Sequence, residues 1–480
     1  MGAPQNQLLK QRKMRGVYHD VGLRAAKVLN VILITLPFAC CWLLYYAKHV
    51  AVSPSALRKA CVIALYGVLF IVFGRIYEAF LVSINRLSEM IWSQLLAILI
   101  TDGCMFIILW LMSGGFPFLP PALGALAAQL ALSLLWCKCA QTWYFHNFSG
   151  QKVAIIYDHE RGIKDLFKKY GLDKKFDVRL HCHVDEFLSG SMDVLDDMDV
   201  VFICGVHSHE RNQILKYCVD IGVCVYVIPR VGDLLMSGAK RMHLFHLPML
   251  RVGRYNPHPE YVLVKRVFDI IFSVFVIVIT SPIMLAAALA IKLQDGGPVF
   301  YRQTRLTKDG REFKIIKFRS MRVDAEKDGV ARLSAGENDK RITPVGRIIR
   351  ACRLDELPQF FNILAGDMSV VGPRPERPEI AAQYEKEMPE FRLRLQTKAG
   401  LTGYAQVYGK YNTLPYDKLQ LDLMYIASPS VIEDLKIIFA TLKILFESES
   451  VEGVAEGAVT AMDTPCVTGK NNTAKAGNDI

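Results

Sequence analysis

The sequence has no CxxC pair among its twelve cysteines, and several of them, such as Cys40, Cys41 and Cys104, lie inside apolar runs. Structural zinc sites and the disulfide frameworks of small secreted domains depend on cysteines at regular spacings. Neither kind of site is therefore indicated, and the soluble parts are expected in a reducing compartment.

Nucleic acid is not an expected partner. The net charge is +11 at pH 7, but no basic tract with interleaved aromatic residues is present. A basic chain without such a tract is better suited to anionic lipid headgroups or to a phosphorylated substrate. The N-terminus is basic ahead of an apolar run, yet no small-residue cleavage site follows, which predicts a retained anchor rather than a removed signal peptide.

Apolar residues are abundant instead. They make up 52% of the residues, a fraction too high for an ordinary soluble enzyme. The chain of 480 residues is also too long for one domain. We predict a basic cytoplasmic segment at residues 1–26 and a four-helix transmembrane domain at residues 27–145, with both ends in the cytoplasm. Asp102 is either a functional group in the membrane or a helix-packing group. Each predicted helix has an apolar run near the about 20 residues needed to cross a bilayer, at residues 28–47, 60–80, 91–112 and 119–137.

Residues 151–250 have a different sequence pattern from the apolar runs before them. Short β-rich segments alternate with amphipathic helical stretches, which predicts a Rossmann-like module with a parallel sheet and crossover helices. The turn after the first strand reads YDHERG and lacks the GxGxxG fingerprint, so dinucleotide binding is not expected. His207 and His209 follow the third strand, but no third metal ligand lies near them in sequence, and we interpret them as part of a solvated loop. Assembly or regulation is the expected role of the module.

A further apolar stretch, at residues 264–293, is interrupted in its middle by Ser281 and Pro282. Proline removes a backbone hydrogen bond and bends a helix, and the serine hydroxyl is placed to satisfy the carbonyl that the proline frees. Basic residues flank both ends, so the charge rule gives this helix no direction. A kinked spanning helix and a helix that enters and returns on the same face both remain open from these residues.

The next segment, residues 298–321, is predicted to form a basic β-hairpin. Two alternating runs surround the sequence KDG, in which Asp309 and Gly310 suit the positive φ angles of a tight turn. A basic hairpin alone indicates a solvated face or a lipid contact. Three later segments, however, add charge of the same sign at residues 346–356, 370–379 and 398–407.

Asp355 and Glu356 are adjacent carboxylates that follow several arginines and precede Pro358. Asp355 suits the N-cap of a helix that has Pro358 in its first turn. One carboxylate could then face a phosphorus atom while its neighbour holds a hard cation. The alternative is that Asp355 only caps the helix and Glu356 pairs with an arginine.

From about residue 264 to residue 446, the chain resembles the bacterial sugar transferase family, the monotopic phosphoglycosyl transferases. The blocks that carry the resemblance occur in order: the apolar segment with Ser281 and Pro282, then GGPVFYRQTR, FKIIKFRSM, RLDELPQFFNILAGDMSVVGPRPE, GLTGYAQV and DLMYIASPSVIEDLKIIFATL. With four preceding helices and a Rossmann-like module, the chain looks like the long form of the family, typified by undecaprenyl-phosphate glucose or galactose phosphotransferases.

The resemblance implies a fold class and an activity. The fold would be a membrane α-helical bundle plus α/β parts, with a mixed α/β catalytic domain at residues 262–450 anchored by a re-entrant helix at 264–293. The enzyme would transfer a sugar 1-phosphate from a UDP-sugar, UDP-glucose or UDP-galactose by this resemblance, to undecaprenyl phosphate and release UMP. This would be the first membrane step of exopolysaccharide or capsule assembly, on the cytoplasmic face of the bacterial inner membrane.

The resemblance also implies roles for single residues. Asp355 matches the nucleophile that forms a covalent aspartyl phosphosugar, and Glu356 matches the residue that holds Mg²⁺. Packing is the alternative for Tyr425, which lies in the same late motif as Asp422. The positions that match substrate-binding residues are Lys317, Arg319, Arg350, Arg374 and Asp422.

Two departures from the family pattern are visible, at Thr307, where many relatives have glycine, and at Arg353, where others carry serine or threonine. Two other classes of function stay open: a catalytically inactive scaffold or regulator of polysaccharide synthesis, and a multi-spanning transporter.

The helical bundle and the Rossmann-like module are compatible with a homodimer. The Gly-, Ala- and Thr-rich tail at residues 451–480 is expected to be disordered.

Overall fold

The structure is a computed structural model that describes residues 3–50, 55–148, 150–158, 163–169, 171–173, 175–323, 341–409 and 414–444. The chain divides into two compact units, Met1–Ile228 and Pro229–Ile480, which are described separately. The tail that is expected to be disordered, residues 451–480, lies outside the described residues.

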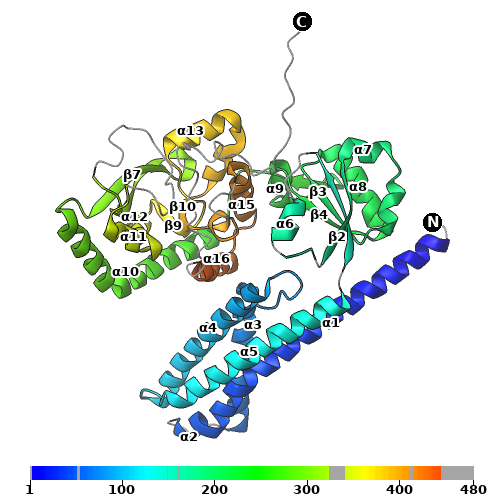
Figure 1. Cartoon of the computed structure of the whole chain (residues 1–480). Helices are drawn as coiled ribbons and strands as arrows, with labels where there is room; N and C mark the ends of the chain where they lie inside the picture. Colours follow the sequence, from blue (N-terminus) through cyan, green and yellow to red (C-terminus); the bar gives the residue numbers. More distant parts are fainter. Residues whose placement is uncertain are drawn as a thin grey trace. The chain divides into compact units, whose positions relative to one another are not determined.

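The first unit begins with long apolar helices. Helix α1 (Ala3–Cys41) continues through a π-helical turn (Trp42–Tyr46) into α2 (Ala47–His49), and α3 (Ala56–Ile76), α4 (Leu87–Ser113) and α5 (Pro120–Asn147) follow (Figure 1). Four stretches of this region, Val17–His49, Ala56–Ile76, Leu87–Ser113 and Pro120–Asn147, are long and apolar enough to cross a membrane. The apolar helices therefore lie where the sequence predicts them, and the number of crossings stays a prediction.

Buried polar side chains join these helices. Gln94 Nε2 donates to Asn30 Oδ1 at 3.2 Å, and Gln129 Nε2 donates to the Tyr66 hydroxyl at 2.8 Å. In an apolar environment, hydrogen bonds of this kind hold helices together because the alternative is an unsatisfied polar group. Asp102 lies on α4, and its Oδ1 is buried without a hydrogen-bond partner among the described residues.

The second part of this unit is a four-stranded parallel sheet, with strand order β2-β1-β3-β4. Both faces are covered: residues of β1 that point to one face pack with Phe167 of α6, and those that point to the other face pack with Ile214 of α8 (Figure 1). Strands buried on two faces read as continuous apolar runs, which is why the sequence signal is clear. The predicted parallel sheet is confirmed, with elements β1 (Gln151–Tyr157), α6 (Ile163–Lys169), β2 (Phe176–His183), α7 (Val184–Ser189), β3 (Val200–Cys204), α8 (Ser208–Ile221) and β4 (Cys224–Ile228).

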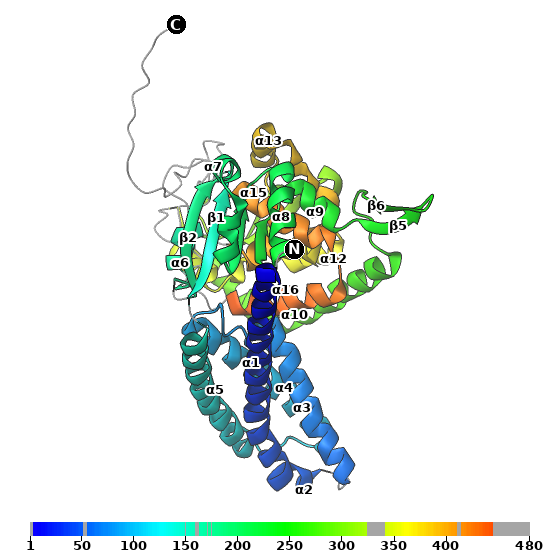
Figure 2. The same ribbon diagram turned by 90° about the vertical axis from the view of Figure 1, so that its right-hand side faces the viewer.

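The second unit opens with α9 (Val231–Ser237) and a hairpin of β5 (Lys240–Leu244) and β6 (Leu247–Arg251). The hairpin extends away from the rest of this unit (Figure 2), and the sequence does not predict it. Its tip, Phe245 and His246, has positive φ angles of 54° and 64°, whereas glycine and asparagine are the residues that signal such turns. The sheet thus ends at Ile228, before the module boundary expected at residue 250.

Helix α10 (Pro259–Asp295) is the fifth helix that is long and apolar enough to cross a membrane. Pro282 lies inside it, and Figure 1 shows the helix bent in its middle. Ser281 Oγ donates to the carbonyl of Val278 at 2.8 Å, and Val278 is the residue whose helical partner Pro282 cannot supply. The predicted compensation of the proline by its neighbouring serine is confirmed.

The core of the second unit surrounds two parallel strands, β9 (Met368–Val371) and β10 (Ala399–Thr402). The backbone near the start of β10 closely approaches the residue that follows β9: a Cβ added at Gly400 would collide with the backbone of Gly372. Only glycine permits such an approach. The surrounding elements are α12 (Gln359–Ala365), α13 (Pro378–Glu387), the 3₁₀ helix η6 (Pro389–Gln396), α14 (Tyr404–Val407), α15 (Pro415–Ala427) and α16 (Val431–Ile444).

The first half of α10 is bonded to this core. Arg266 donates to the carbonyls of Ile363 at 2.7 Å and Leu364 at 2.9 Å, near the end of α12. A cation at a helix C-terminus satisfies carbonyls that lack an intrahelical partner. The buried Asp269 accepts the backbone N–H of Val370 in β9 at 3.0 Å. The apolar helix α10 is therefore fixed to both α12 and β9.

Candidate active site

The basic hairpin consists of β7 (Phe300–Leu306) and β8 (Glu312–Phe318), which pair in antiparallel fashion. Asp309 and Gly310 have φ angles of 61° and 76°, which confirms the predicted KDG turn. Thr307, a departure from the family pattern, is buried, and its hydroxyl donates to the carbonyl of Asp367 at 2.8 Å. The backbone of Lys317 pairs with that of Tyr301 across the hairpin, so the side chain that carries its ammonium group starts from a hydrogen-bonded strand.

Asp355 and Glu356 lie in a 3₁₀ turn, Leu354–Glu356, between α11 (Pro344–Ala351) and α12. The prediction that Asp355 caps a helix is wrong, because the N-cap of α12 is Pro358 and Asp355 already lies in a helical turn. Arg353, the residue before this turn, has φ 51°, a left-handed conformation that costs a non-glycine residue on the order of 1–3 kcal/mol and is typical of functional sites.

Glu356 is bound by two cations. Its Oε1 lies 3.0 Å from Lys317 Nζ and 3.1 Å from a terminal nitrogen of Arg374. Burial disfavours the ionised form of this carboxyl, but Lys317 and Arg374 outweigh that cost and hold its pKa well below the usual range. Glu356 is therefore ionised at every physiological pH.

Asp355 has a different environment. Burial and the adjacent Glu356 raise its pKa above the usual range, and the positive charges of Lys317, Arg350 and Arg374 oppose that rise. Among the described residues, none donates a hydrogen bond to the Asp355 carboxylate. A partly exposed carboxylate with no donor of its own keeps its oxygen lone pairs available for an incoming group.

The two other predicted arginines, Arg350 and Arg319, differ in how they interact with the two adjacent carboxylates. Arg350 donates from Nε to Ser320 Oγ at 2.8 Å, and its charge acts on Asp355. Arg319 is buried and pairs with Asp295 at the end of α10, next to Gly297. The structure thus gathers Lys317, Arg350 and Arg374 around the two carboxylates and ties Arg319 to the membrane-type helix.

Asp422 is buried and paired with an arginine. Its side chain on α15 is 1% exposed, and its Oδ2 accepts from Arg394 at 2.7 Å. In this structure the carboxylate is enclosed and already paired, and the predicted contact with substrate stays a prediction. Tyr425 is also buried and donates to Asp434 Oδ1 at 2.8 Å, in keeping with packing as the alternative for that residue.

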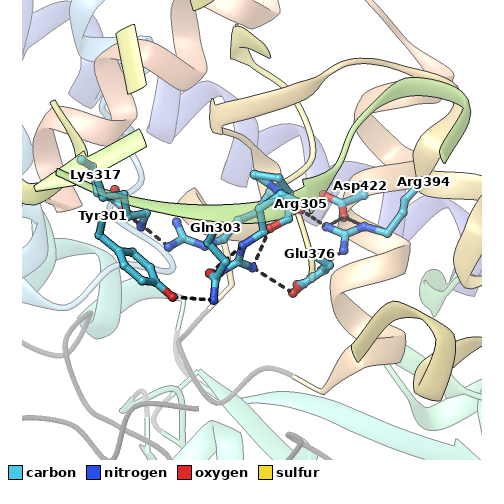
Figure 3. Close-up of polar contacts among 10 residues, drawn as sticks. Tyr301, Gln303, Arg305, Lys317, Glu376, Arg394 and Asp422 are labelled. Carbon is cyan, nitrogen blue, oxygen red and sulfur yellow. Dashed lines mark hydrogen bonds and ion pairs between the residues drawn. The ribbon is translucent and has the colours of Figure 1, made fainter. Parts of the chain in front are cut away.

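Three residues that sequence reasoning did not assign form a line with Asp422 (Figure 3): Arg305, Glu376 and Arg394. Arg394 lies in the stretch FRLRLQ, where arginines alternate with leucines. That pattern is typical of a half-exposed element and does not distinguish a buried arginine from an exposed one. Only the structure shows that Arg394, with its side chain 3% exposed, is enclosed.

Two histidines, one after β3 and one at the end of β2, lie near the same aspartate. His207 Nε2 lies 3.7 Å from Asp158 Oδ2, and His183 Nε2 lies 3.6 Å from Asp158 Oδ1. Within the part of the chain that the structure describes, no group of three or more His, Cys, Asp or Glu residues could hold a metal ion.

Comparison with known proteins matches residues 260–448 to the family model described as bacterial sugar transferase. The matched range contains the apolar helix α10 except its first residue, the basic hairpin and every residue of the candidate site. Residues 1–259, with the helical bundle and the parallel sheet, lie outside the match.

Three curated relatives carry informative names. A UDP-N-acetylgalactosamine-undecaprenyl-phosphate N-acetylgalactosaminephosphotransferase of Aeromonas hydrophila is 39% identical over 237 residues, 49% of this chain and 55% of the relative. UDP-glucose:undecaprenyl-phosphate glucose-1-phosphate transferases of Escherichia coli (41% over 212 residues, 43% of this chain and 44% of the relative) and Caulobacter vibrioides (40% over 206 residues, 42% and 76%) are also similar. The chain spans about half the length of the first two relatives.

Proposed function

The chain belongs to the bacterial sugar transferase family, and on that premise we propose that it transfers a sugar 1-phosphate from a UDP-sugar to undecaprenyl phosphate. UMP is the second product. The observation that carries this proposal is the Asp355–Glu356 turn, in which one carboxylate is held by two cations and the other is left without a donor among the described residues.

In the first step, a carboxylate oxygen of Asp355 attacks the phosphorus that bears the sugar. The bond from that phosphorus to the bridging oxygen of the diphosphate breaks, and UMP leaves with the electron pair. In the second step, an oxygen of undecaprenyl phosphate attacks the same phosphorus, and the aspartate leaves as a carboxylate. A covalent intermediate of this kind divides one difficult displacement into two easier ones.

Charge neutralisation is the main requirement for this chemistry, because an anion attacks a dianionic diphosphate. Lys317, Arg350 and Arg374 supply positive charge around Asp355. Arg374 is 45% exposed, so its guanidinium can also reach a phosphate or the nucleotide while one nitrogen stays on Glu356. Arg319 supports the site from Asp295 rather than by a phosphate contact.

Magnesium fits the residues that are present. Mg²⁺ takes oxygen ligands and is commonly held by one or two carboxylates together with substrate phosphates and water. Glu356 is ionised, and only its Oε1 is engaged by Lys317 and Arg374, which leaves Oε2 for a cation. Bound Mg²⁺ would neutralise charge on the diphosphate oxygens.

The acceptor is a lipid, so the site has to lie at the depth of the headgroups. We propose that α10 enters the bilayer and returns on the same face, which its bend at Pro282 and the Ser281–Val278 hydrogen bond support. Four crossings before it would leave both ends of the chain in the cytoplasm, and the site on the cytoplasmic face of the inner membrane.

The donor sugar is proposed as glucose or galactose. Relatives are named for glucose and for N-acetylgalactosamine, so the N-acetylated sugar is the natural competitor. One relative, from Rhizobium leguminosarum, is named an exopolysaccharide production protein, in line with a role at the start of exopolysaccharide or capsule assembly.

The alternative function is an inactive scaffold or regulator of polysaccharide synthesis. UMP release separates the two. Full-length protein in detergent or nanodiscs is mixed with Mg²⁺, undecaprenyl phosphate and, in turn, UDP-glucose, UDP-galactose and UDP-N-acetylgalactosamine. Release of UMP with one donor supports the transferase and identifies the sugar, whereas no release with any UDP-sugar favours the scaffold.

A further inference from the structure

Four charged side chains of alternating sign form a continuous line beside the active site (Figure 3). Arg305 Nη1 lies 3.9 Å from Glu376 Oε2, and Glu376 Oε1 lies 3.5 Å from Arg394 Nη1. Arg394 Nη2 lies 2.7 Å from Asp422 Oδ2. Their side chains are only 19%, 20%, 3% and 1% exposed along this order, so each buried charge depends on its neighbours for compensation.

The two arginines of this line also hold the main chain of the turn that carries Arg374. Arg394 Nη2 donates to the carbonyl of Arg374 at 2.9 Å, and Arg305 Nη1 donates to the carbonyl of Pro375 at 3.0 Å. The backbone N–H of Leu306 donates to the carbonyl of Glu376 at 3.0 Å. Three consecutive carbonyls of the turn are thus each fixed from outside it.

External donors matter here because the turn has few of its own. Arg374 lies between Pro373 and Pro375, neither of which has a backbone N–H. The guanidinium of Arg374 in turn lies 3.1 Å from Glu356 Oε1. The position of this active-site cation therefore depends on how firmly its own carbonyl is held.

We propose that Arg394 is a positioning residue, anchored by Asp422 and Glu376, which fixes the Arg374 backbone so that the Arg374 guanidinium meets Glu356 and the donor phosphates. Its kinetic test rests on the proposed transferase function. Arg394 itself is enclosed and touches no substrate. Its planar fork serves three acceptors at once, which a lysine ammonium on a flexible stem cannot do in the same geometry.

A double-mutant cycle tests the proposal. Arg394→Lys should lower kcat/KM for UMP release by about 10–100-fold, the scale of a catalytic group misplaced by about 1 Å. Arg374→Ala should cost roughly 10²–10³-fold, as for loss of one transition-state donor. If Arg394 acts through Arg374, both variants divide the loss between kcat and KM in the same way, and the double variant is no worse than Arg374→Ala. Losses that multiply would overturn the proposal.

Arg392→Lys is the matched control. Arg392 lies on the same 3₁₀ helix but is exposed, so its replacement should leave kcat/KM unchanged. A loss as large as that of Arg394→Lys would assign the effect to the helix as a whole and would contradict a specific role for Arg394.

Hydrogen exchange gives a readout that does not need activity. In Arg394→Lys, the amides of Arg374, Glu376 and Arg377 should exchange faster than in wild type, and in Arg392→Lys they should not. If Arg394→Lys fails to fold, Asp422→Asn takes its place, because it removes the negative charge that anchors Arg394 and keeps Arg394 itself. The same local increase in amide exchange is then expected. Unchanged exchange in both variants would overturn the proposal. Absence of UMP release by wild type would count against the transferase function alone, because the exchange result still decides the role of Arg394.

Discussion

Asp355 and Glu356 are consecutive in the chain, yet the pKa values of their carboxyl groups shift in opposite directions. Burial favours the neutral form of both, so the difference comes from the cations. Lys317 and Arg374 form ion pairs with Glu356, whereas they act on Asp355 only through longer-range electrostatic attraction. Asp355 also lies next to the ionised Glu356, which disfavours its own ionisation. One carboxylate is thereby a fixed negative charge, and the other is a group whose protonation responds to pH.

Asp355→Asn should abolish turnover. The amide retains the shape of the carboxylate but cannot form the phosphate ester, and loss of a nucleophile costs roughly 10⁴-fold or more in kcat. The measurement is UMP release together with intact mass after incubation with donor and no lipid. Wild type should gain the mass of a sugar phosphate and the variant should not; wild-type UMP release by the variant would contradict the mechanism.

The same substitution should leave the protein equally or more stable. An acid whose pKa is raised on folding binds more protons in the folded state, so stability falls as pH rises from the unfolded pKa through the folded one. At neutral pH the full cost of the buried charge is present, and the neutral amide of Asp355→Asn removes it. The midpoint of thermal unfolding at neutral pH should therefore not decrease, and a clear decrease would show that Asp355 has a structural role.

The first half-reaction should lose activity on the acid side at a pH above the ordinary carboxyl range. Asp355 attacks only when ionised, and its pKa is raised by burial and by Glu356. Glu356→Gln removes the neighbouring charge, so the acid limb of its residual activity should move to lower pH. Single-turnover UMP release without lipid, between about pH 4 and 8, separates this limb from titration of the acceptor phosphate. A limb at the same pH in both proteins would exclude Asp355 as the titrating group.

Membrane topology should place both ends of the chain on one side. With α10 re-entrant after four crossings, green fluorescent protein fused after Ile480 should fluoresce and alkaline phosphatase fused there should be inactive. The reverse pattern would mean that α10 spans. Pro282→Ala restores the hydrogen bond to Val278 and should straighten the helix, so a mixed pattern is expected from this variant.

Gly400→Ala should destabilise the catalytic domain. A methyl group there collides with the backbone of Gly372, and overpacking of this kind typically costs about 1–3 kcal/mol. Gly253→Ala is the matched control, because a Cβ at Gly253 would meet no atom within 4 Å and its φ is not positive. The midpoint of thermal unfolding should fall by several degrees in the first variant and not in the second. Equal midpoints would show that the two strands can separate without cost.

Local chemistry explains what the sequence predicts correctly. Asp309 and Gly310 both readily adopt the positive φ angles of a tight turn, and Ser281 lies one residue before a proline that leaves a carbonyl unpaired. Such features depend on residues close in sequence. The parallel sheet is also predictable, because strands buried on both faces have uninterrupted apolar runs.

Long-range pairing explains the errors. The sequence does not connect Asp422 with Arg394, so their ion pair is not predicted; the two residues meet only through the packing of η6 against α15. The predicted start of α12 is wrong because Arg353 adopts a left-handed conformation that starts an extra turn before the helix. The β5–β6 hairpin gives no sequence signal because Phe245 and His246 take the place of the usual turn residues.

The contacts of Arg266 and Asp269 imply that the core around β9 and α12 cannot be separated from α10 by truncation without loss of these bonds. A water-soluble fragment that begins at Gly296 would lose the guanidinium that caps α12 and the carboxylate that holds Val370. Of the two elements, α12 directly follows the turn with Asp355 and β9 follows α12. We therefore expect that detergent or lipid would still be required for a competent active site, even with a donor that dissolves freely in water.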